Sequence, residues 1–484
     1  MDSLRLKFNM IFLLSFLAFI NGIKSDFLQA ADQKHHSSSG KQTKKTASKK
    51  RKKRTVCRLF FQDYKTKTVK WADVISGDTL RMETPSVIKG FPKLDAEDQN
   101  LVQMESSSGT ILLGVRDSEG GEDQSGWIFI NSGVKEESHG DHSHWYYKAH
   151  PKVIASQLDA KQGNPAHLYC YQGVFYLAND RISGYTRLDP QTYLDQPTQK
   201  IKTGFHLGGG NHITLAVVEG KTGYASWIDG GGPQKGIIDV TRIRPEGNKE
   251  IVYSFALPSG AIHGATTCAG KVFFAPADGI CWCEADLNPV PQNKKNIKIH
   301  HLSLGKDEET KKPNRTGAFS THRNYVLFLS GKGTTARLCL LNAKSNQPEV
   351  ISVPLNMLEG NSPVALQVIK TAWGKRLAFV FHNHPKELEQ DEFLSVIDLD
   401  PDNDLDFVDA KLRKQIKVGP SNVEGHYGHH DIKFDRAGRY AFWTEPGAAK
   451  IKALSLKTLE PISTFTVSGT PTKLIVMGQQ DRMK

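Results

Sequence analysis

The chain has 484 residues, of which 38% are hydrophobic, 24% are charged and 42 are glycine. This length allows one large domain or two to three ordinary ones, and frequent glycine with modest hydrophobicity favours a turn-rich β protein over a helical one. The formal net charge is +12, but residues 1–54 hold 13 basic and 3 acidic residues and so account for +10 of it. The remainder is nearly neutral, which argues against a folded body that binds nucleic acid.

The N-terminus has the pattern of a secretory signal. Arg5 and Lys7 precede a short apolar run at residues 10–20, and a polar region with small residues follows. The run is too short to span a bilayer comfortably. We therefore expect residues 1–30 to be a signal peptide, with an uncleaved N-terminal anchor as the alternative, and the mature protein to be periplasmic or secreted. No other stretch of the sequence is long and apolar enough to cross a membrane.

Residues 31–56 form a Ser-, Lys- and Arg-rich segment with too few apolar side chains to fold alone. Basic runs of this kind can mark proteins that enter the nucleus or bind nucleic acid. Behind a signal peptide, a disordered, solvated linker that touches anionic envelope surfaces is the better interpretation. We therefore predict no nucleic-acid partner and one folded domain over residues 57–484.

The cysteines are scattered and form no CxxC pair, so they do not predict a zinc ribbon. In Cys281-Trp282-Cys283 the two thiols should share one face of a strand. A disulfide is possible in an exported protein, but the sequence leaves the pairing open. The six cysteines are Cys57, Cys170, Cys268, Cys281, Cys283 and Cys339.

From Cys57 onward the sequence repeats a loose unit of about fifty residues. The clearest copy contains four apolar segments, and Gly438 lies in the turn between the first two. Four short strands in this order are typical of one blade of a β-propeller. The segments of this copy cover residues 431–435, 439–444, 449–456 and 461–467.

Two incomplete copies lie at the ends of the repeat region. Three predicted strands at residues 58–61, 69–74 and 79–82 have no inner strand before them, and residues 472–477 form an inner strand with no successors. Joined, they complete one blade, and closing the ring in this way removes exposed sheet edges. The sequence therefore predicts an all-β, eight-bladed propeller, with seven blades as the alternative.

A polar segment with three histidines, His139-Gly140-Asp141-His142-Ser143-His144, has neither a strand nor a helix period. Neutral imidazole is the commonest protein ligand for zinc, and a flexible loop can fold such side chains around one ion. The alternative is a polar surface loop that happens to be rich in histidine. We take His139, His142 and His144 as candidate metal ligands.

Further histidines stand just before predicted inner strands, about fifty residues apart. Inner strands of a propeller run parallel around a central channel, so residues in these positions should converge at one mouth of the channel and could form a zinc site. The alternative is that each histidine satisfies carbonyl groups of the next blade. His382 to His384 are expected in a surface turn, and His300-His301 on a solvated outer strand. The candidate ligands are His167, His212, His263 and His426, with His430 as an extra ligand or a supporting group.

With these motifs in order, residues 57–480 resemble the AztD-type family of periplasmic zinc metallochaperones. The resemblance rests on the opening segment at residues 58–80, the HGDHSH segment, and three motifs that follow it. It implies a propeller that gathers zinc on a flexible loop, holds it, and passes it to the periplasmic solute-binding protein of a zinc ABC importer. The family's disulfide has no counterpart at residues 258–260 and 275–276. The three motifs are Pro165-Ala166-His167-Leu168, His263-Gly264-Ala265 and Gly425-His426-Tyr427, and His212 matches the family's repeat that begins with a second histidine.

The resulting hypothesis is a non-enzymatic, monomeric zinc carrier whose affinity falls below about pH 6.5, where imidazole takes up a proton. Histidine ligands also suit copper and nickel. One alternative is a metal-dependent propeller enzyme, either a copper redox protein or a hydrolase that would use Glu424 or Asp431 as its base. Another is an interaction scaffold that binds no metal.

Overall fold

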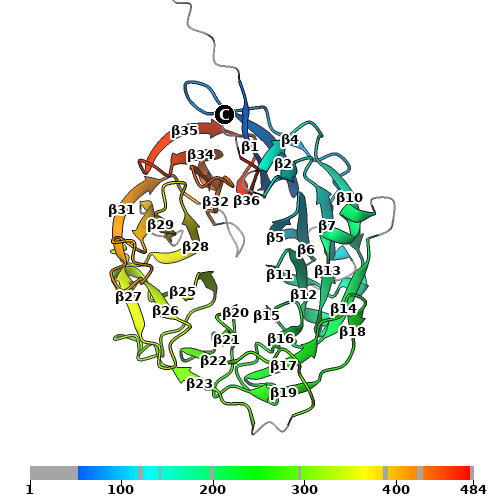
Figure 1. Ribbon diagram of the computed structural model, residues 1–484, viewed down its shortest axis with the longest axis vertical. Coiled ribbons are helices and arrows are strands. Elements are labelled where there is room, and N and C mark those ends of the chain that lie inside the picture. The colour runs from blue at the N-terminus through cyan, green and yellow to red at the C-terminus, as the bar shows by residue number, and fades with distance from the viewer. Residues whose placement is uncertain are drawn as a thin grey trace, which may run out of the picture. The chain divides into compact units, whose positions relative to one another are not determined.

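A computed structural model describes residues 53–96, 98–117, 124–140, 143–196, 201–292, 296–384, 391–421 and 429–479. Eight sheets follow one another along these residues, each with four or five strands, and a two-stranded hairpin stands apart from them. Figure 1 shows the sheets arranged as blades around a central opening. No helix in the described ranges has the length and apolar character needed to span a membrane.

The first four blades, numbered from the closing blade, contain the following strands from the channel outward. Blade 1 has β36 (Pro471–Met477), β1 (Thr55–Asp63), β2 (Thr68–Ile75) and β3 (Arg81–Met82), with β4 (Ser86–Val87) on β2. Blade 2 has β5 (Gln99–Ser107), β6 (Thr110–Asp117), β7 (Gly126–Asn131) and β10 (Lys152–Leu158). Blade 3 has β11 (Pro165–Tyr171), β12 (Val174–Asn179), β13 (Gly184–Leu188), β14 (Thr203–Leu207) and β18 (Gly247–Asn248). Blade 4 has β15 (Leu215–Val218), β16 (Thr222–Ser226), β17 (Ile237–Arg242) and β19 (Tyr253–Ala256).

The other four blades repeat this order with four strands each. Blade 5 has β20 (Ala265–Cys268), β21 (Lys271–Phe274), β22 (Ile280–Glu284) and β23 (His300–Leu302). Blade 6 has β24 (Phe319–His322), β25 (Tyr325–Ser330), β26 (Arg337–Asn342) and β27 (Val350–Pro354). Blade 7 has β28 (Ser362–Lys370), β29 (Arg376–Asn383), β30 (Glu392–Asp398) and β31 (Lys411–Val418). Blade 8 has β32 (Ile432–Phe434), β33 (Tyr440–Glu445), β34 (Lys450–Ser455) and β35 (Glu460–Thr466). A short helix, α1 (Pro190–Asp195), lies between β13 and β14.

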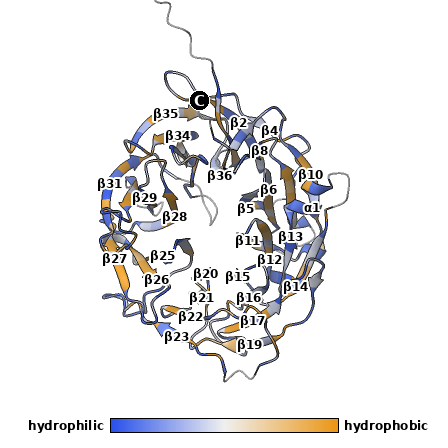
Figure 2. Ribbon diagram, in the orientation of Figure 1, coloured by the Kyte–Doolittle hydropathy of each residue, from blue (hydrophilic) through white to orange (hydrophobic). Residues whose placement is uncertain are grey.

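The middle strands of the blades carry the core. Strands β6, β25 and β29 are nearly continuous apolar runs, as expected when both faces of a sheet are covered by neighbouring blades. Figure 2 shows hydrophobic residues along strands such as β26 and β27. The apolar clusters lie between successive blades, and one of them packs Phe379 of blade 7 against Trp443 of blade 8. The inner strand β28, by contrast, is half-buried along almost its whole length.

Glycine turns join the first two strands of several blades, as the repeat predicts. Gly438 adopts a φ of +64°, and a Cβ atom there would lie 2.8 Å from the carbonyl oxygen of Lys370 in the preceding blade. Only glycine therefore fits both the left-handed backbone and the close approach of the two blades.

The ring closes through the two ends of the repeat region. Strand β36 pairs antiparallel with β1, with Arg58 opposite Met477 and Phe61 opposite Leu474. The eight inner strands contact one another in a cycle, β36–β5–β11–β15–β20–β24–β28–β32 and back to β36. The predicted eight-bladed propeller and its closure are confirmed, and β1 begins at Thr55, two residues before the expected start of the domain.

All six cysteines lie within the described residues and all are free. Cys281 and Cys283 are buried in one apolar cluster, so they share a strand face as predicted. Burial raises the pKa of each of these two thiols to about 12. These groups are therefore neutral core side chains at neutral pH.

Candidate metal centre

Three of the predicted ligands meet where successive inner strands begin. His167 lies near the start of β11, His212 precedes β15, and His263 precedes β20. One ring nitrogen from each histidine lies within 4.8 Å of those of the other two. The ring centroids are 4.5 Å apart for His167 and His212, 5.1 Å for His212 and His263, and 5.8 Å for His167 and His263. We call these residues the histidine triad.

Local backbone features bring the triad residues together. Three glycines and Asn211 precede His212, and Asn211 takes the left-handed conformation (φ +64°), which asparagine tolerates well. Gly264 follows His263, and a Cβ atom at this glycine would lie 3.3 Å from the backbone of Gly317 in the next blade. The small residue therefore lets the chain beside His263 pass close to its neighbour.

His212 is oriented by a carboxylate of the preceding blade. Its Nδ1 atom lies 3.2 Å from Oδ2 of Asp180, which is 3% exposed. The other oxygen of Asp180 accepts a hydrogen bond from the backbone N–H of Ile213 at 3.0 Å, and Arg116 donates to the same carboxylate. A proton on Nδ1 of His212 leaves the lone pair of Nε2 available to a metal.

His263 is oriented by a backbone carbonyl. Its Nδ1 atom lies 3.1 Å from the oxygen of Gly317, so Nδ1 carries the proton and Nε2 is left to bind a metal. Burial lowers the pKa of His263, and the nearby His212 and Arg315 lower it further against the opposing effect of the Gly317 carbonyl. The imidazole is therefore neutral at pH 7, which is the form that binds metal.

His167 faces both His212 and a glutamine. Its Nε2 atom is 2.8 Å from Nε2 of His212, and its Nδ1 atom is 3.5 Å from the amide nitrogen of Gln103. Gln103 also accepts the backbone N–H of Leu168 through Oε1, which fixes its amide group. Since Nε2 of His212 carries a lone pair, His167 carries its proton on Nε2, and metal binding there moves the proton to Nδ1 or to solvent.

The triad can hold one metal ion with three imidazole nitrogens. Ligand atoms on a tetrahedral zinc ion stand about 3.3 Å apart, given Zn–N distances near 2.0 Å. The distance of 2.8 Å between Nε2 of His167 and Nε2 of His212 must therefore increase slightly. The longest distance between ligand nitrogens of the triad must decrease. In the described part of the chain, no fourth histidine, cysteine or carboxylate joins the group. Such a shell leaves one position open to water or to a ligand from another protein.

The HGDHSH segment follows a strand and runs into the next one: Ser143 and His144 lie in a strand where a loop was predicted, whereas His139 and Gly140 lie outside the strands. Strands β8 (Lys135–Ser138) and β9 (Ser143–Tyr146) pair with Glu137 opposite His144. The rings of His139 and His144 lie 5.2 Å apart, centroid to centroid, and Nε2 of His139 is 3.9 Å from a carboxylate oxygen of Glu137. Asp141 and His142 lie outside the described residues. Four-residue strands are too short to show a period in the sequence.

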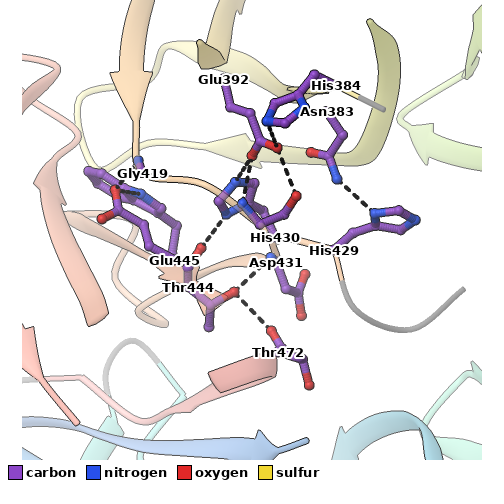
Figure 3. Close-up of polar contacts among 12 residues, drawn as sticks. Asn383, His384, Glu392, Gly419, His429, His430, Asp431, Thr444, Glu445 and Thr472 are labelled. Carbon is purple, nitrogen blue, oxygen red and sulfur yellow. Dashed lines mark hydrogen bonds and ion pairs between the residues drawn. The ribbon is translucent and has the colours of Figure 1, made fainter. Parts of the chain in front are cut away.

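His430 precedes β32, in the position equivalent to those of His212 and His263, but it does not join the triad. Its Nε2 atom contacts Glu392 of blade 7, and Nε2 of His384 lies near the same carboxylate (Figure 3). The prediction of a surface turn at His382 to His384 was wrong, because His382 and Asn383 lie buried in β29 and the side chain of His384 is only 7% exposed. His426 lies outside the described residues.

Sequence reasoning missed the groups that support these histidines. Each supporting group comes from the blade before that of its histidine. Gln103 contacts His167, Asp180 contacts His212, and Glu392 contacts His430. No local motif marks such residues, because the contact is made only when the blades pack.

Of the two carboxylates considered as the base of a hydrolase, Asp431 lies within the described residues. Asp431 accepts backbone N–H groups of Ile432 and Leu474 with its two oxygens. Glu424 lies outside the described residues. A separate group of three carboxylates, Asp400, Asp402 and Asp404, lies in the turn between β30 and β31 and contains no histidine.

Comparisons with known proteins identify solved structures with a similar fold. AztD from Citrobacter koseri aligns with a TM-score of 0.60 at 17% identity, and its apo form with 0.59 at 16%; each alignment covers 89% of this chain and 100% of the other. The dihydro-heme d1 dehydrogenase NirN aligns with a TM-score of 0.52 at 13% identity, over 86% of this chain and 74% of that one.

No protein-family profile matches the sequence. No curated protein sequence matches it either. At these identities the structural similarity concerns the fold alone. The chain is an eight-bladed β-propeller with a fold similar to that of AztD, and three histidines from successive blades are placed to hold a metal ion.

Proposed function

We propose that this protein is a non-enzymatic zinc carrier, a metallochaperone that passes zinc to the solute-binding protein of an ABC importer. The convergence of His167, His212 and His263 carries the proposal, because it joins three nitrogen ligands from three blades. Three imidazoles suit zinc, and an incomplete shell permits release. The fold shared with AztD and the order of the histidine motifs support the choice of cargo.

The hairpin would serve as the site of first capture. His139 and His144 stand close together beside Glu137, and His142 lies between them in sequence. In this scheme zinc binds first to His139, His142 and His144, and then moves to the histidine triad, with His426 as a further ligand there. A partner ligand that enters the open position of the triad would begin the transfer.

Metal counting tests the first part of the proposal. The mature protein would be loaded with zinc, freed of excess metal, and analysed by mass spectrometry beside a His167→Ala, His212→Ala variant. We expect the wild type to hold at least one equivalent more than this variant. The exposed residue His301 provides a control, since His301→Ala removes an imidazole outside the triad. Equal zinc contents in wild type and triad variant would rule out the triad as a zinc site.

Kinetics test capture and transfer separately. A variant with His139, His142 and His144 changed to Ala should load zinc more slowly while reaching the same final content at the triad. Zinc-loaded protein mixed with a zinc-free solute-binding protein should lose metal faster as the acceptor concentration rises. A loss rate that does not depend on the acceptor would contradict direct transfer and leave a zinc-binding protein that only buffers the ion.

A further inference from the structure

The turn between β30 and β31 carries aspartates at alternate positions. Asp400, Asp402 and Asp404 each offer one carboxylate oxygen, and these three oxygens lie within 4.8 Å of one another. Asp400 is fully buried, whereas Asp402 and Asp404 are exposed. We call these three residues the aspartate cluster. The cluster is therefore open to an ion from solvent and is anchored in the protein by its first member.

Hydrogen bonds hold the three carboxylates in place. Oδ2 of Asp400 accepts a hydrogen bond from Nη1 of Arg376 at 2.7 Å, and its Oδ1 atom accepts one from the backbone N–H of Leu405 at 3.3 Å. Oδ1 of Asp402 and Oδ1 of Asp404 each accept the backbone N–H two residues further on, at 3.2 Å and 2.7 Å. A carboxylate oxygen has two lone pairs, so each group can bind an ion while it keeps its hydrogen bond.

A further carboxylate, that of Asp409, faces the cluster from near the end of the same turn. Its Oδ1 atom is fully buried and has no hydrogen-bond partner among the described residues. Burial raises the pKa of Asp409, and the nearby charges of Asp402 and Asp400 raise it further against the opposing effect of backbone hydrogen bonds. Buried polar atoms without a partner are rare in native proteins, and a bound ion is one of the few arrangements that satisfies them.

A second carboxylate oxygen without a partner lies at the start of the turn. Asp398, the last residue of β30, is 3% exposed, and its Oδ1 atom is fully buried and accepts no hydrogen bond from the described residues. Its Oδ2 atom pairs with Arg413 at 2.9 Å. Nζ of Lys375 lies 3.9 Å from the same oxygen and donates to the carbonyl oxygen of Pro401, within the turn. Each end of the turn therefore holds one buried carboxylate oxygen without a partner.

The negative charge of the turn is not balanced by basic side chains. The segment from Asp398 to Asp409 contains six aspartates and no lysine or arginine. Three basic side chains from elsewhere in blade 7 pair with the first two of these aspartates. Within the described part of the chain, no basic side chain forms an ion pair with the other four. A divalent cation in the cluster would supply the missing positive charge.

The ligand type and the spacing favour calcium. Calcium binds six to eight oxygen atoms at about 2.4 Å, so two of its ligand oxygens can stand up to about 4.8 Å apart, as those of the cluster do. Loops that bind calcium between two helices place acidic ligands at positions 1, 3 and 5 and a glycine at position 6. Asp400, Asp402 and Asp404 have this spacing, and Leu405 at position 6 takes the left-handed backbone (φ +76°). The cluster contains neither the imidazole nor the thiolate ligands that suit zinc.

We propose that Asp400, Asp402 and Asp404 bind one calcium ion, with Asp409 as a further carboxylate ligand. Backbone carbonyl groups of the turn and water would fill the remaining positions, as in other calcium sites. The cluster belongs to blade 7 and uses oxygen ligands, whereas the histidine triad belongs to blades 3 to 5 and uses nitrogen ligands. The calcium site therefore does not depend on the function proposed for the triad.

Calorimetric titration with calcium tests this site. The protein would be freed of metal with a chelator and titrated with calcium alone, and we expect one equivalent to bind with a Kd at or below about 1 mM. The Asp402→Asn, Asp404→Asn variant keeps the shape of two exposed side chains, so it should fold, and it should bind calcium at least about tenfold more weakly. Glu308→Gln, Glu309→Gln is the control, because it removes two exposed charges from another turn and should bind calcium like the wild type.

Thermal unfolding distinguishes a calcium site from general screening of charge. An ion that binds only the folded protein raises its Tm, and magnesium, which requires stricter geometry, should raise the Tm of the wild type less than calcium at the same concentration. This difference should disappear in the Asp402→Asn, Asp404→Asn variant, and Asp409→Asn should weaken calcium binding several-fold. No calcium binding by the wild type, equal affinities in the wild type and the folded double variant, or equal effects of the two ions on Tm would overturn the proposal.

Discussion

Asp180 and His212 form a carboxylate–histidine pair across two blades. Asp180 follows β12 in blade 3, whereas His212 precedes β15 of blade 4, and the atoms Oδ2 and Nδ1 are 3.2 Å apart. The same relationship recurs where Glu392 of blade 7 contacts His430 at the start of blade 8. In both cases a carboxylate from one blade fixes the imidazole with which the next blade begins.

The first prediction concerns this pair. Asp180→Asn weakens the hydrogen bond that holds Nδ1–H of His212 and lowers the basicity of Nε2. We expect zinc affinity at the triad to fall by about tenfold, the lower end of the range for such supporting residues. Competition with a chromophoric chelator measures the affinity. Asp239→Asn is a matched control, because Asp239 is also 3% exposed and accepts hydrogen bonds from Trp227, Gly209 and Ser254, with no triad histidine among these donors.

The second prediction concerns Gln103, whose amide N–H faces Nδ1 of His167. In Gln103→Glu one carboxylate oxygen can still accept a hydrogen bond from the backbone N–H of Leu168. The other oxygen can accept a hydrogen bond from Nδ1–H of His167. This holds the lone pair of Nε2 toward the metal, so zinc should bind several-fold more tightly. Gln103→Leu provides neither contact and should bind more weakly. The same chelator competition measures both variants, and equal affinities would contradict a role for Gln103 in orienting His167.

The third prediction concerns Arg58, which clamps the base of the β8–β9 hairpin. Its guanidinium donates to the carbonyl oxygens of Ser132, Tyr147 and Ala149, which flank the hairpin, and forms a bidentate pair with Asp73. Lysine cannot make this set of hydrogen bonds. Arg58→Lys should lower the free energy of unfolding by about 3 kcal/mol, as expected when a buried charged network is broken.

Hydrogen exchange distinguishes a local clamp from a general loss of stability. If Arg58 holds the hairpin, exchange at residues 135–138 and 143–146 in Arg58→Lys should accelerate more than in the core strands of blades 5 and 6. Uniform acceleration across all blades would contradict the clamp.

The fourth prediction concerns acid stability. His206 is fully buried, and burial lowers its pKa to about 4 from an ordinary value of 6.5. As pH falls from 6.5 to 4 the unfolded chain takes up a proton that the folded chain does not, so the free energy of unfolding falls with pH in this window. Above about pH 6.5 the residue makes no pH-dependent contribution. The full effect is at most about 3 kcal/mol.

Urea unfolding of the metal-free protein at pH 7, 5.5 and 4.5 measures this dependence. His206→Gln removes the titrating group but keeps a polar side chain, so its stability should fall less steeply with decreasing pH than that of the wild type. Parallel curves for the two proteins would show that His206 does not account for the acid sensitivity.

The fifth prediction concerns the cysteines. Burial raises the pKa of Cys170, Cys268 and Cys339 to about 11 and that of Cys281 and Cys283 to about 12. Little thiolate is present at pH 8, so the native protein should react slowly with a thiol reagent. After denaturation without a reductant, six thiols should react. A count of four or fewer would show that disulfides form in the protein.

The repeat, the number of blades and the closing blade could be predicted because they depend on local patterns. Apolar segments, glycine turns such as that at Gly438, and the unmatched strands at the two ends are all visible in the sequence. The triad followed from the same periodicity, since equivalent positions in successive blades converge at one end of the channel.

The supporting groups and the second histidine cluster could not be predicted in this way. Asp180 lies 32 residues before His212, and Glu392 lies 38 residues before His430. Neither spacing corresponds to a helix or strand period. His384 directly follows strand β29, and many residues in such a position are exposed in turns. Only the packing of blade 8 against blade 7 buries its side chain.

Ring closure has a consequence for the order in which this protein assembles. The backbone N–H of Thr470 donates to Asp63, so the closing contact joins residues 407 positions apart. Until β36 has been synthesised, β1 presents an unpaired edge that can pair with other chains. Contacts of such long range form slowly. Blade 1 therefore contains both the first and the last strand of the ring in sequence, and its sheet is complete only after the other seven blades have been synthesised.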